Sequence, residues 1–558
     1  MFEKNLQFIN NDGLKGRLRI MSLEQSSKDM SYCMTPSNDY LLMKNDVPLD
    51  DMENPREAIR QMLKATIKQP MGSNDIIITF GIGLCYLLDE VFNTYPSKIF
   101  IYEPDLSILH FVLNNVDISE HLQSGRVYIT DDINELTGKL SSTYITKDKV
   151  EVVFLKNYAV VKNQELLELT QKVYEACRGK IVDINTIAKF SKKWLFNTLK
   201  NLCRIKNGKI SNIFDLENKF IGQTALILAP GPSLNENIQY IKENRQKYVI
   251  FAVNKVLRFL QANDITPDFA VALDASYVSN TLSGLEDFCS QINCIADLKS
   301  DYEILDKTFK KVFLTFSEND AIAKELASFN KHIKLYELGS SATTMAFVVA
   351  EKFGFSKIVY AGLDMAFKDD VMYSTGETIN RLVNNQIGIG SATKNIVHVP
   401  SVTGSMVATR DDYATAISHF EALLQAVDYN EVYNTTSFGA NIKGMKNQPL
   451  DTIIVFGNSA TLPIIINDVQ PLQVEVGEWG QHELMLINNI ITLLSNGGFS
   501  SGLVSAIVKS PLIYTHMQVD VINVLQTHFA EENAESFINA TKLAIKEVID
   551  LLQKNTLI

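Results

Sequence analysis

Several features that define whole classes of proteins are missing from this sequence of 558 residues. The six cysteines are scattered and form no CxxC pair, which excludes zinc-finger spacing and argues against a disulfide framework. A net charge of -12 without any long basic run argues against a nucleic-acid binder that depends on neutralising phosphates. The apolar runs stop far short of the roughly 20 residues of a membrane helix, and the N-terminal segment lacks the apolar core of a signal peptide. We therefore expect a cytoplasmic protein with neither a nucleic-acid nor a membrane partner.

The composition that remains is that of an ordinary globular protein, with 46% hydrophobic and 21% charged residues. Such a length exceeds a single hydrophobic core and suggests about three to four structural units. The pattern of strands and helices predicts three domains. These are an α/β Rossmann-like domain with a helical linker over 1–205, a second α/β domain over 206–455, and a helical domain over 456–558.

The first α/β segment carries part of a dinucleotide-binding fingerprint. A strand over 76–80 runs into Gly81-Ile82-Gly83, and a second strand over 98–102 ends at Glu103, about 20 residues further on. Tyr86 replaces the third glycine of the fingerprint. Two interpretations stay open: Glu103 holds a ribose hydroxyl, as in methyltransferases, or the unit is purely structural.

The second α/β segment reads as a series of parallel strands separated by helices. Such alternation favours a doubly wound, mainly parallel sheet, in which ligands bind at the carboxyl ends of the strands. The expected strands are 225–229, 248–253, 269–273, 294–296, 311–316, 358–361 and 431–434. Between the two α/β segments, apolar residues at helical spacing over 163–205 predict a long helical connection.

The stretch from Thr224 to Leu234 is the strongest candidate for a binding turn. Its apolar start predicts a buried strand, and Pro230-Gly231-Pro232-Ser233 predicts a tight turn leading into a helix. Gly231 lets the backbone approach a ligand closely, and Pro232 fixes φ. Ser233 or Asn235 can cap the following helix, whose N-terminal amides favour an anion. A phosphate seat and an ordinary strand-to-helix turn both fit these residues.

Polar residues follow several of the other predicted strands. They are Asn254, Asp274, Gly362 with Asp364, and Asn434. Because carboxyl ends of parallel strands meet at one edge of a sheet, we expect these residues to share a pocket. A carboxylate after a strand also commonly caps local amides, so Asp364 has a structural alternative. Ser340, Ser341, Thr343 and Thr344 are expected to cap the helix that follows them, a geometry that also serves as an anion site.

The order of these segments resembles a known family. TALILAPGPSLNENI, VIFAVNKVLRFLQANDITPDFAVALDAS, GSSATTMAFVVAEKFGFSKIVYAGLDMAF and VYNTTSFGANIKG together resemble the motility-associated factor (Maf) glycosyltransferases of flagellated bacteria. The N-terminal NPREA and ITFGIGLCYLLDEVF segments fit as well. The resemblance implies a central GT-A-like domain similar to bacterial sialyltransferases. It also implies transfer of a nonulosonic acid, of the pseudaminic or legionaminic type, from CMP to serines and threonines of flagellin, as required for flagellum assembly and motility.

The resemblance also assigns roles to residues. The sialyltransferase donor turn matches Ala229 to Leu234, so Gly231, Pro232 and Ser233 would contact the donor, with Ala229 in place of the first glycine. Asn254 would contact the nucleotide, Ser340-Ser341-Ala342 the sugar carboxylate, and Gly362-Leu363-Asp364 would line the site. Of two tyrosines that hold the leaving phosphate in those enzymes, Tyr373 matches the second approximately, and Ala366 stands near the first. His398 takes the place of the catalytic histidine, in a loop before a helix.

The chemistry of CMP-sugar transfer agrees with one absence. Enzymes that use nucleotide diphosphates usually bind a metal through a DxD motif, and none occurs between residues 221 and 445. We therefore expect no required metal or other cofactor, although Asp274 or Asp364 leaves Mg²⁺ open. A neutral histidine with a reference pKa of about 6.5 is suited to general base catalysis, and His398 is the candidate. A homo-oligomer is possible.

Three rival functions fit parts of the sequence. The central segment resembles archaeal 6-hydroxymethylpterin diphosphokinases, which would require Mg²⁺ and ATP. A non-catalytic flagellin-binding protein would keep the pocket as a relic. A methyltransferase would use Gly81, Gly83 and Glu103.

Overall fold

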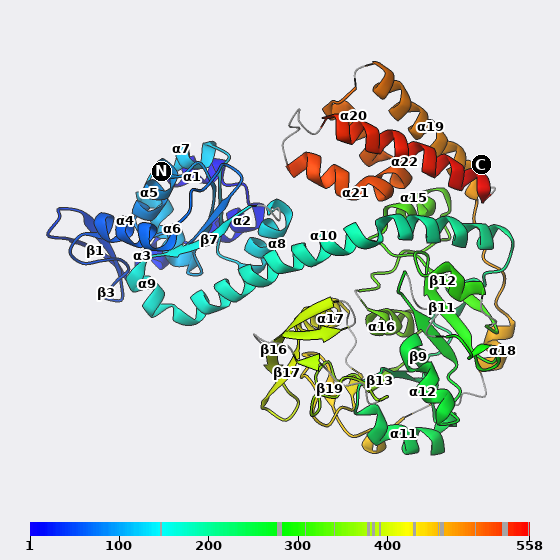
Figure 1. Cartoon of the computed structure of the whole chain (residues 1–558). Coiled ribbons are helices and arrows are strands. Elements are labelled where there is room, and N and C mark those ends of the chain that lie inside the picture. Colours follow the sequence, from blue (N-terminus) through cyan, green and yellow to red (C-terminus); the bar gives the residue numbers. More distant parts are fainter. Residues whose placement is uncertain are drawn as a thin grey trace. The chain divides into compact units, whose positions relative to one another are not determined.

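The structure is a computed structural model (Figure 1). It describes residues 1–558 except 145–147, 276–281, 307–308, 340, 376–379, 382–385, 390–391, 428–430, 456, 458–461, 497, 527–533, 556 and 558. For 181–183, 305–306, 380–381, 386–389 and 392–394 it describes the backbone alone.

The chain forms two compact units, Met1–Asn185 and Thr186–Ile558. The boundary falls inside helix α10 (Asn163–Lys206), which confirms the helical connection predicted over 163–205.

The first unit is built on a four-stranded parallel sheet in the order β6-β5-β4-β7. All five residues of β4 are buried, as expected for a strand covered on both faces. The strands are β4 (Ile76–Phe80), β5 (Lys98–Tyr102), β6 (Val127–Thr130) and β7 (Val150–Phe154), close to their predicted positions. A smaller antiparallel sheet contains β1 (Met30–Met34), β2 (Tyr40–Lys44) and β3 (Val47–Pro48). The helices are α1 (Phe2–Phe8), α2 (Asp12–Ile20), α3 (Leu23–Ser27), α4 (Pro55–Thr66), α5 (Tyr86–Thr94), α6 (Leu106–Asn115), α7 (Ser119–Gln123), α8 (Ile133–Thr143) and α9 (Lys156–Val161).

The second unit contains an eight-stranded sheet in which every neighbouring pair is parallel. Its order is β12-β11-β10-β9-β8-β13-β18-β19. The strands are β8 (Thr224–Leu228), β9 (Val249–Val253), β10 (Phe269–Ala272), β11 (Asn293–Asp297), β12 (Val312–Thr315), β13 (Lys357–Ala361), β18 (Val432–Asn434) and β19 (Lys446–Asn447). The two parallel α/β sheets confirm the predicted fold class.

The strand order reverses once within this sheet. From β8 the chain builds β9 to β12 outward on one side, and it then returns to place β13 on the other side of β8. In doubly wound sheets this switch point opens a crevice at the carboxyl ends of the two strands, where ligands bind. The turns after β8 and β13 therefore mark the expected site.

Helices cover both faces of the sheet, and α16 packs against β8, β9 and β10. The α-helices of this region are α11 (Leu234–Glu243), α12 (Leu257–Ala262), α14 (Glu286–Cys289), α15 (Ala321–Phe329), α16 (Ala342–Lys352) and α17 (Asp411–Ala426).

A four-stranded antiparallel sheet, which the sequence did not predict, is inserted between β13 and α17. Its strands are β14 (Asn380–Arg381), β15 (Gln386–Ile389), β16 (Ala392–Pro400) and β17 (Met406–Arg410). The β16–β17 hairpin pairs His398 with Ala408 and Ile396 with Arg410, so these four residues share one face of the hairpin.

The C-terminal region is helical, as predicted, and Figure 1 shows its four longest helices gathered together. They share one hydrophobic core with the sheet, because Trp479, Ile487 and Leu512 belong to the same buried cluster as Leu226 and Leu314. The division of residues 206–558 into two domains stays a prediction. The helices are α18 (Leu462–Asn467), α19 (Val476–Asn496), α20 (Ser501–Lys509), α21 (Pro511–Gln526) and α22 (Ala534–Lys554).

Candidate functional site at the switch point of the large sheet

The turns after β8 and β13 touch each other through their backbones. The Gly231 amide donates to the Gly362 carbonyl at 2.8 Å, and the Ala229 amide donates to the Ala361 carbonyl at 2.9 Å. A Cβ on Gly231 would lie 2.4 Å from the Gly362 oxygen, and one on Gly362 would lie 2.1 Å from the Ala229 oxygen. Gly362 also has a φ of +80°, which favours glycine. Glycine is therefore required at both positions for the two turns to interlock.

The Asp364 carboxylate fastens this pair of turns. It is 1% exposed and accepts hydrogen bonds from the Ser233 amide, at 2.8 Å, and from the Ser233 hydroxyl. Burial raises the pKa of Asp364, while hydrogen bonds from Ser233 and Thr436 oppose that rise. The structure thus gives Asp364 a positioning task, because its oxygens are engaged in holding the turn. Its predicted catalytic role stays a prediction.

Residues in and after β18 hold the turn that contains Asp364. The Asn434 side chain donates to the Leu363 carbonyl at 2.9 Å, and the Ala440 amide donates to the Asp364 carbonyl at 2.8 Å. Asn434, which was predicted at the carboxyl end of the last strand, therefore stabilises the turn after β13.

Asn254 and Asp274 lie at the carboxyl ends of the next two strands. Asn254 directly follows β9 and is 8% exposed, and no residue in the described part of the chain hydrogen bonds to its side chain. Its amide atoms do not belong to the fully buried polar atoms without a partner, so they remain accessible to a ligand or to water. Asp274 is exposed after β10. Surrounding protein atoms raise its pKa, and the Lys255 ammonium opposes that rise.

The predicted capping residues begin helix α16. Ser341 accepts the Thr344 amide at 3.2 Å in a capping box, and its hydroxyl lies 2.8 Å from the Thr343 hydroxyl. Thr343 is buried, and its carbonyl accepts the Tyr360 hydroxyl at 2.9 Å. Ser340 lies outside the described residues. The capping interpretation is correct, and the anion site at the same helix start stays a prediction.

Tyr373 lies beside the turn after β8. The amide of the next residue, Ser374, donates to the Pro230 carbonyl at 2.7 Å, and the Asn235 side chain donates to the Ser374 carbonyl at 3.0 Å. These bonds hold the buried Tyr373 near the donor turn predicted from the sequence.

His398 does not lie in a loop before a helix. It lies in the middle of β16, opposite Ala408, and its side chain is exposed. The preceding residue on the same face, Ile396, packs with Ala408 against Phe367, Met372 and Tyr373. The β-branched residues Ile396, Val397 and Val399 favour a strand here, and the Thr403-Gly404 segment is the hairpin turn. The loop placement was wrong, but the histidine shares a hairpin face with the residues that pack on Tyr373.

Sequence reasoning missed three residues next to Tyr373. Lys255 follows Asn254, Arg410 ends β17, and Tyr413 lies in the first turn of α17. The Lys255 Nζ lies 3.7 Å from the Tyr373 ring centroid, and the Tyr373 and Tyr413 hydroxyls are 3.3 Å apart. Only the position of Lys255, one residue beyond a strand-end asparagine, gave a signal in the sequence.

The nucleotide position of the first unit is filled by the protein itself. Glu103 is 1% exposed and accepts the Ile82 amide at 3.1 Å, the Asp105 amide at 3.0 Å and the Tyr158 hydroxyl. A Cβ on Gly81 would lie 2.6 Å from the Tyr158 ring, so this ring covers the glycine turn. Desolvation raises the pKa of Glu103 to about 7, although these three bonds oppose the rise. The geometry supports the structural interpretation of this unit.

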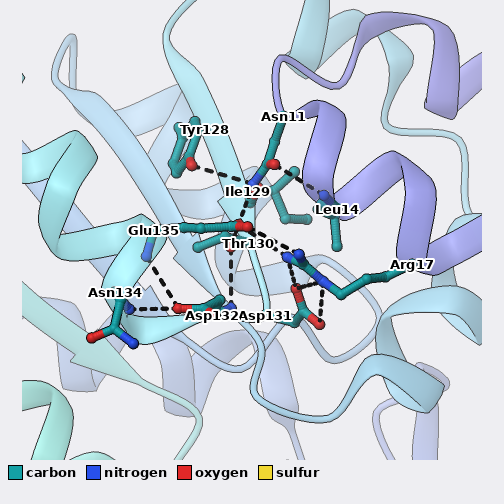
Figure 2. A network of polar contacts seen from close by, with 10 residues as sticks. All are labelled: Asn11, Leu14, Arg17, Tyr128, Ile129, Thr130, Asp131, Asp132, Asn134 and Glu135. Carbon is teal, nitrogen blue, oxygen red and sulfur yellow. Dashed lines mark hydrogen bonds and ion pairs between the residues drawn. The ribbon is translucent and has the colours of Figure 1, made fainter. Parts of the chain in front are cut away.

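A second polar cluster of the first unit is also internal (Figure 2). Arg17 on α2 donates to Asp131 at 2.6 Å and to Glu135 at 2.9 Å, and Asn11 donates to Glu135 at 2.7 Å. Hydrogen bonds from Arg17, Asn11 and Thr130 lower the pKa of Glu135 to about 2, although desolvation opposes that shift. The cluster therefore fastens α2 to the end of β6.

Two structural features are absent from the described residues. These residues contain no helix long and apolar enough to cross a bilayer. The same part of the chain places no three histidine, cysteine or carboxylate side chains together as metal ligands.

Comparisons with known proteins bear on the fold of this chain. Residues 196–370 match the family model described as 6-hydroxymethylpterin diphosphokinase MptE-like. An uncharacterized protein of Treponema pallidum (strain Nichols) is 30% identical over 126 residues, which are 22% of this chain and 56% of that protein, so the match spans about half of the relative. The solved structure of the Maf glycosyltransferase from Magnetospirillum magneticum AMB-1 is similar with a TM-score of 0.65 and 15% identity, over 99% of this chain and 95% of that one. The chain therefore has the fold of a Maf glycosyltransferase, and the predicted resemblance is confirmed at that level.

Proposed function

We propose that this protein is a glycosyltransferase that moves a nonulosonic acid from a CMP-activated donor to serines or threonines of flagellin. The fold shared with a Maf glycosyltransferase supports the reaction class. The sequence resemblance to the Maf family suggests the donor and the acceptor. Action in the cytoplasm belongs to the same proposal.

The observation that carries the proposal is the arrangement at the switch point. An interlocked glycine turn ends at the start of an α-helix, and the unpartnered Asn254 amide lies at the end of the adjacent strand. Backbone donors at such a turn suit a ribose or phosphate group, and a free amide suits a polar edge of a base or sugar. These groups would bind the nucleotide of the donor.

The second requirement is a base for the acceptor hydroxyl. In this proposal, His398 removes the proton from a flagellin serine or threonine while the acceptor oxygen attacks the anomeric carbon. Its exposed position on the β16–β17 hairpin makes it accessible to a protein acceptor.

The decisive experiment is the intact mass of flagellin produced together with this chain. Cells that make a CMP-nonulosonic acid should yield flagellin heavier by whole sugar residues, and cells without the donor should yield unmodified flagellin. A double variant, Ser233→Ala with Asn254→Ala, should also leave flagellin unmodified. Unmodified flagellin with the wild-type chain, donor and acceptor all present would refute the proposal.

A second candidate function rests on the match of residues 196–370 to the pterin diphosphokinase-like family. Diphosphate transfer to 6-hydroxymethylpterin would consume ATP in the presence of Mg²⁺ and would release AMP. AMP release that depends on the pterin, without any release of CMP from CMP-sugars, would favour this candidate. A protein that binds flagellin and releases neither nucleotide would instead be a non-catalytic binding module.

A further inference from the structure

A cluster of cations and phenols lies beside the proposed donor turn. Lys255 follows β9 immediately after Asn254, and its ammonium lies 3.7 Å from the centre of the Tyr373 ring. Lys255 is exposed, and no carboxylate of the described chain lies within ion-pair distance of it. Asp274 acts on it only through the longer-range field. A lysine at a strand end that pairs with a phenol ring leaves its positive charge available to an anion.

The Tyr373 hydroxyl is held on its other side by residues from a distant part of the chain. Tyr413 lies 3.3 Å away through its hydroxyl, and the Arg410 guanidinium stacks 4.0 Å above the centre of the Tyr413 ring. Asp412 accepts two hydrogen bonds from Arg410, at 2.6 and 2.8 Å, which fixes the guanidinium against the ring. The phenol pair is thereby immobilised next to the lysine.

The surroundings also change the acidity of the two phenols. Burial alone would raise the pKa of Tyr373, but the charge of Lys255 and the hydroxyl contact with Tyr413 lower it overall. Desolvation and the neighbouring Tyr373 raise the pKa of Tyr413, so Tyr413 is the weaker acid of the pair, and either hydroxyl can donate in the contact between them. A phenol of lowered pKa is a stronger hydrogen-bond donor to an anion.

This cluster is tied to the donor turn by the protein backbone. Ser374, the neighbour of Tyr373, donates its amide to Pro230, and Lys255 is the neighbour of Asn254. An anion bound between Lys255 and Tyr373 would therefore belong to the same ligand that contacts the turn and Asn254.

We propose that Lys255, with the Tyr373–Tyr413 phenol pair, binds the phosphate of the donor nucleotide and neutralises it as it leaves. This inference rests on the proposed function and adds a charge carrier that the family resemblance does not assign. Tyr413 supplies the second phenol at a site where Ala366 leaves the expected tyrosine position empty. The fixed ammonium takes the role that a divalent cation has in many sugar-diphosphate enzymes.

The bonds of the transfer step balance with these groups. The bond from the anomeric carbon to the phosphate oxygen breaks, and its electron pair stays on the phosphate. Lys255 and the Tyr373 hydroxyl stabilise that oxygen, while the acceptor oxygen forms the new bond and gives its proton to the base. CMP leaves with its phosphate as a dianion.

The test compares the binding of CMP and of cytidine by calorimetry. Lys255→Met should weaken CMP binding about 10- to 100-fold, since a charge-assisted hydrogen bond is lost, and should leave cytidine binding unchanged. Lys255→Arg should restore most of the affinity for CMP. Lys242 is an exposed lysine in the last turn of α11 that pairs with Asp264, so Lys242→Met should behave as wild type.

Each other outcome identifies what has failed. Equal CMP affinity in wild type and Lys255→Met, with both folded by melting temperature, would overturn the role of Lys255 and leave the proposed function standing. CMP binding that disappears in EDTA and returns with Mg²⁺ would overturn it as well, because a metal would then carry the charge. A wild-type chain that binds neither CMP nor cytidine would instead remove the CMP-sugar proposal itself.

Discussion

The sharpest prediction on stability concerns a buried carboxyl between the C-terminal helical region and helix α15. Glu483 on α19 is 0% exposed and accepts the Ser510 hydroxyl at 2.7 Å through one oxygen. Its other oxygen receives no hydrogen bond from a described donor and faces the Glu325 carboxylate of α15. Glu325 already accepts the Trp479 indole at 2.6 Å, and His482 lies 3.2 Å away. If Glu483 carries a proton, it can donate a hydrogen bond to Glu325, so that neither carboxyl oxygen of Glu483 is left without a partner.

The sign and size of the effect follow from that proton. Desolvation, together with the Glu325 carboxylate, raises the pKa of Glu483 to about 9. The unfolded chain releases the same proton near pH 4.3, so the folded state binds one proton more between these values. Unfolding free energy therefore falls as pH rises through that window, by up to about 1.4 kcal/mol per pH unit, and levels off above it. Between pH 6 and pH 8 the loss would reach about 3 kcal/mol.

Replacement by glutamine should remove this dependence. In Glu483→Gln the amide oxygen can accept from Ser510 and the amide nitrogen can donate to Glu325, without any titrating proton. The stability of the variant relative to wild type should rise by up to about 3 kcal/mol from pH 6 to pH 8.

The two tryptophans, Trp194 and Trp479, both lie in the second unit and report its unfolding. Urea titrations followed by tryptophan emission at pH 6, 7 and 8 would measure the difference. Glu478 is exposed and lies five residues before Glu483 on the same helix, so Glu478→Gln serves as the control and should show no such trend. A stability difference between Glu483→Gln and wild type that is constant across this range would refute the shared proton.

Three further predictions concern the turn, the first unit and the base. Gly362→Ala should abolish CMP binding and lower the melting temperature, because the added Cβ overlaps the Ala229 carbonyl oxygen. Gly404 has a similar φ but open space around it, so Gly404→Ala should lower the free energy of unfolding by only about 1 kcal/mol. Calorimetry of CMP binding and thermal melts separate the two variants. Arg17→Met should destabilise the first unit by about 1 kcal/mol in urea unfolding, and the exposed Arg19→Met should not; equal stability would show that the cluster contributes nothing. His398→Ala should abolish flagellin glycosylation while CMP binding stays intact, and near-normal turnover would exclude it as the base.

The two parallel sheets could be predicted from the sequence because their strands carry strong local signals. Runs such as Ile76–Phe80 and Thr224–Leu228 are apolar on both faces and end at glycine or proline, so hydrophobic pattern and turn chemistry agree. Strand-end residues then follow from topology, which is why Ser233 and Asp364 meet although 131 positions separate them.

Side-chain neighbours from different elements left no such signal. The contact of Tyr373 with Tyr413 crosses 40 residues and an antiparallel sheet that local patterns did not reveal. In the first unit, Tyr158 covers the glycine turn. Its position depends on the path of the chain after β7, which the glycine fingerprint does not predict. Short motifs predict the backbone geometry of a turn. Which side chains fill the space beside that turn depends on residues far away in the sequence.

The bond between the Ser374 amide and the Pro230 carbonyl has a consequence for how this site tolerates change. It joins two main-chain groups, so replacement of the side chain at either residue, other than proline at position 374, leaves it in place. Selection could thus alter the phenol at position 373, or the polar groups around it, while its distance from the turn stays constant. The scaffold would accept new donor chemistries one side chain at a time, without having to rebuild its geometry.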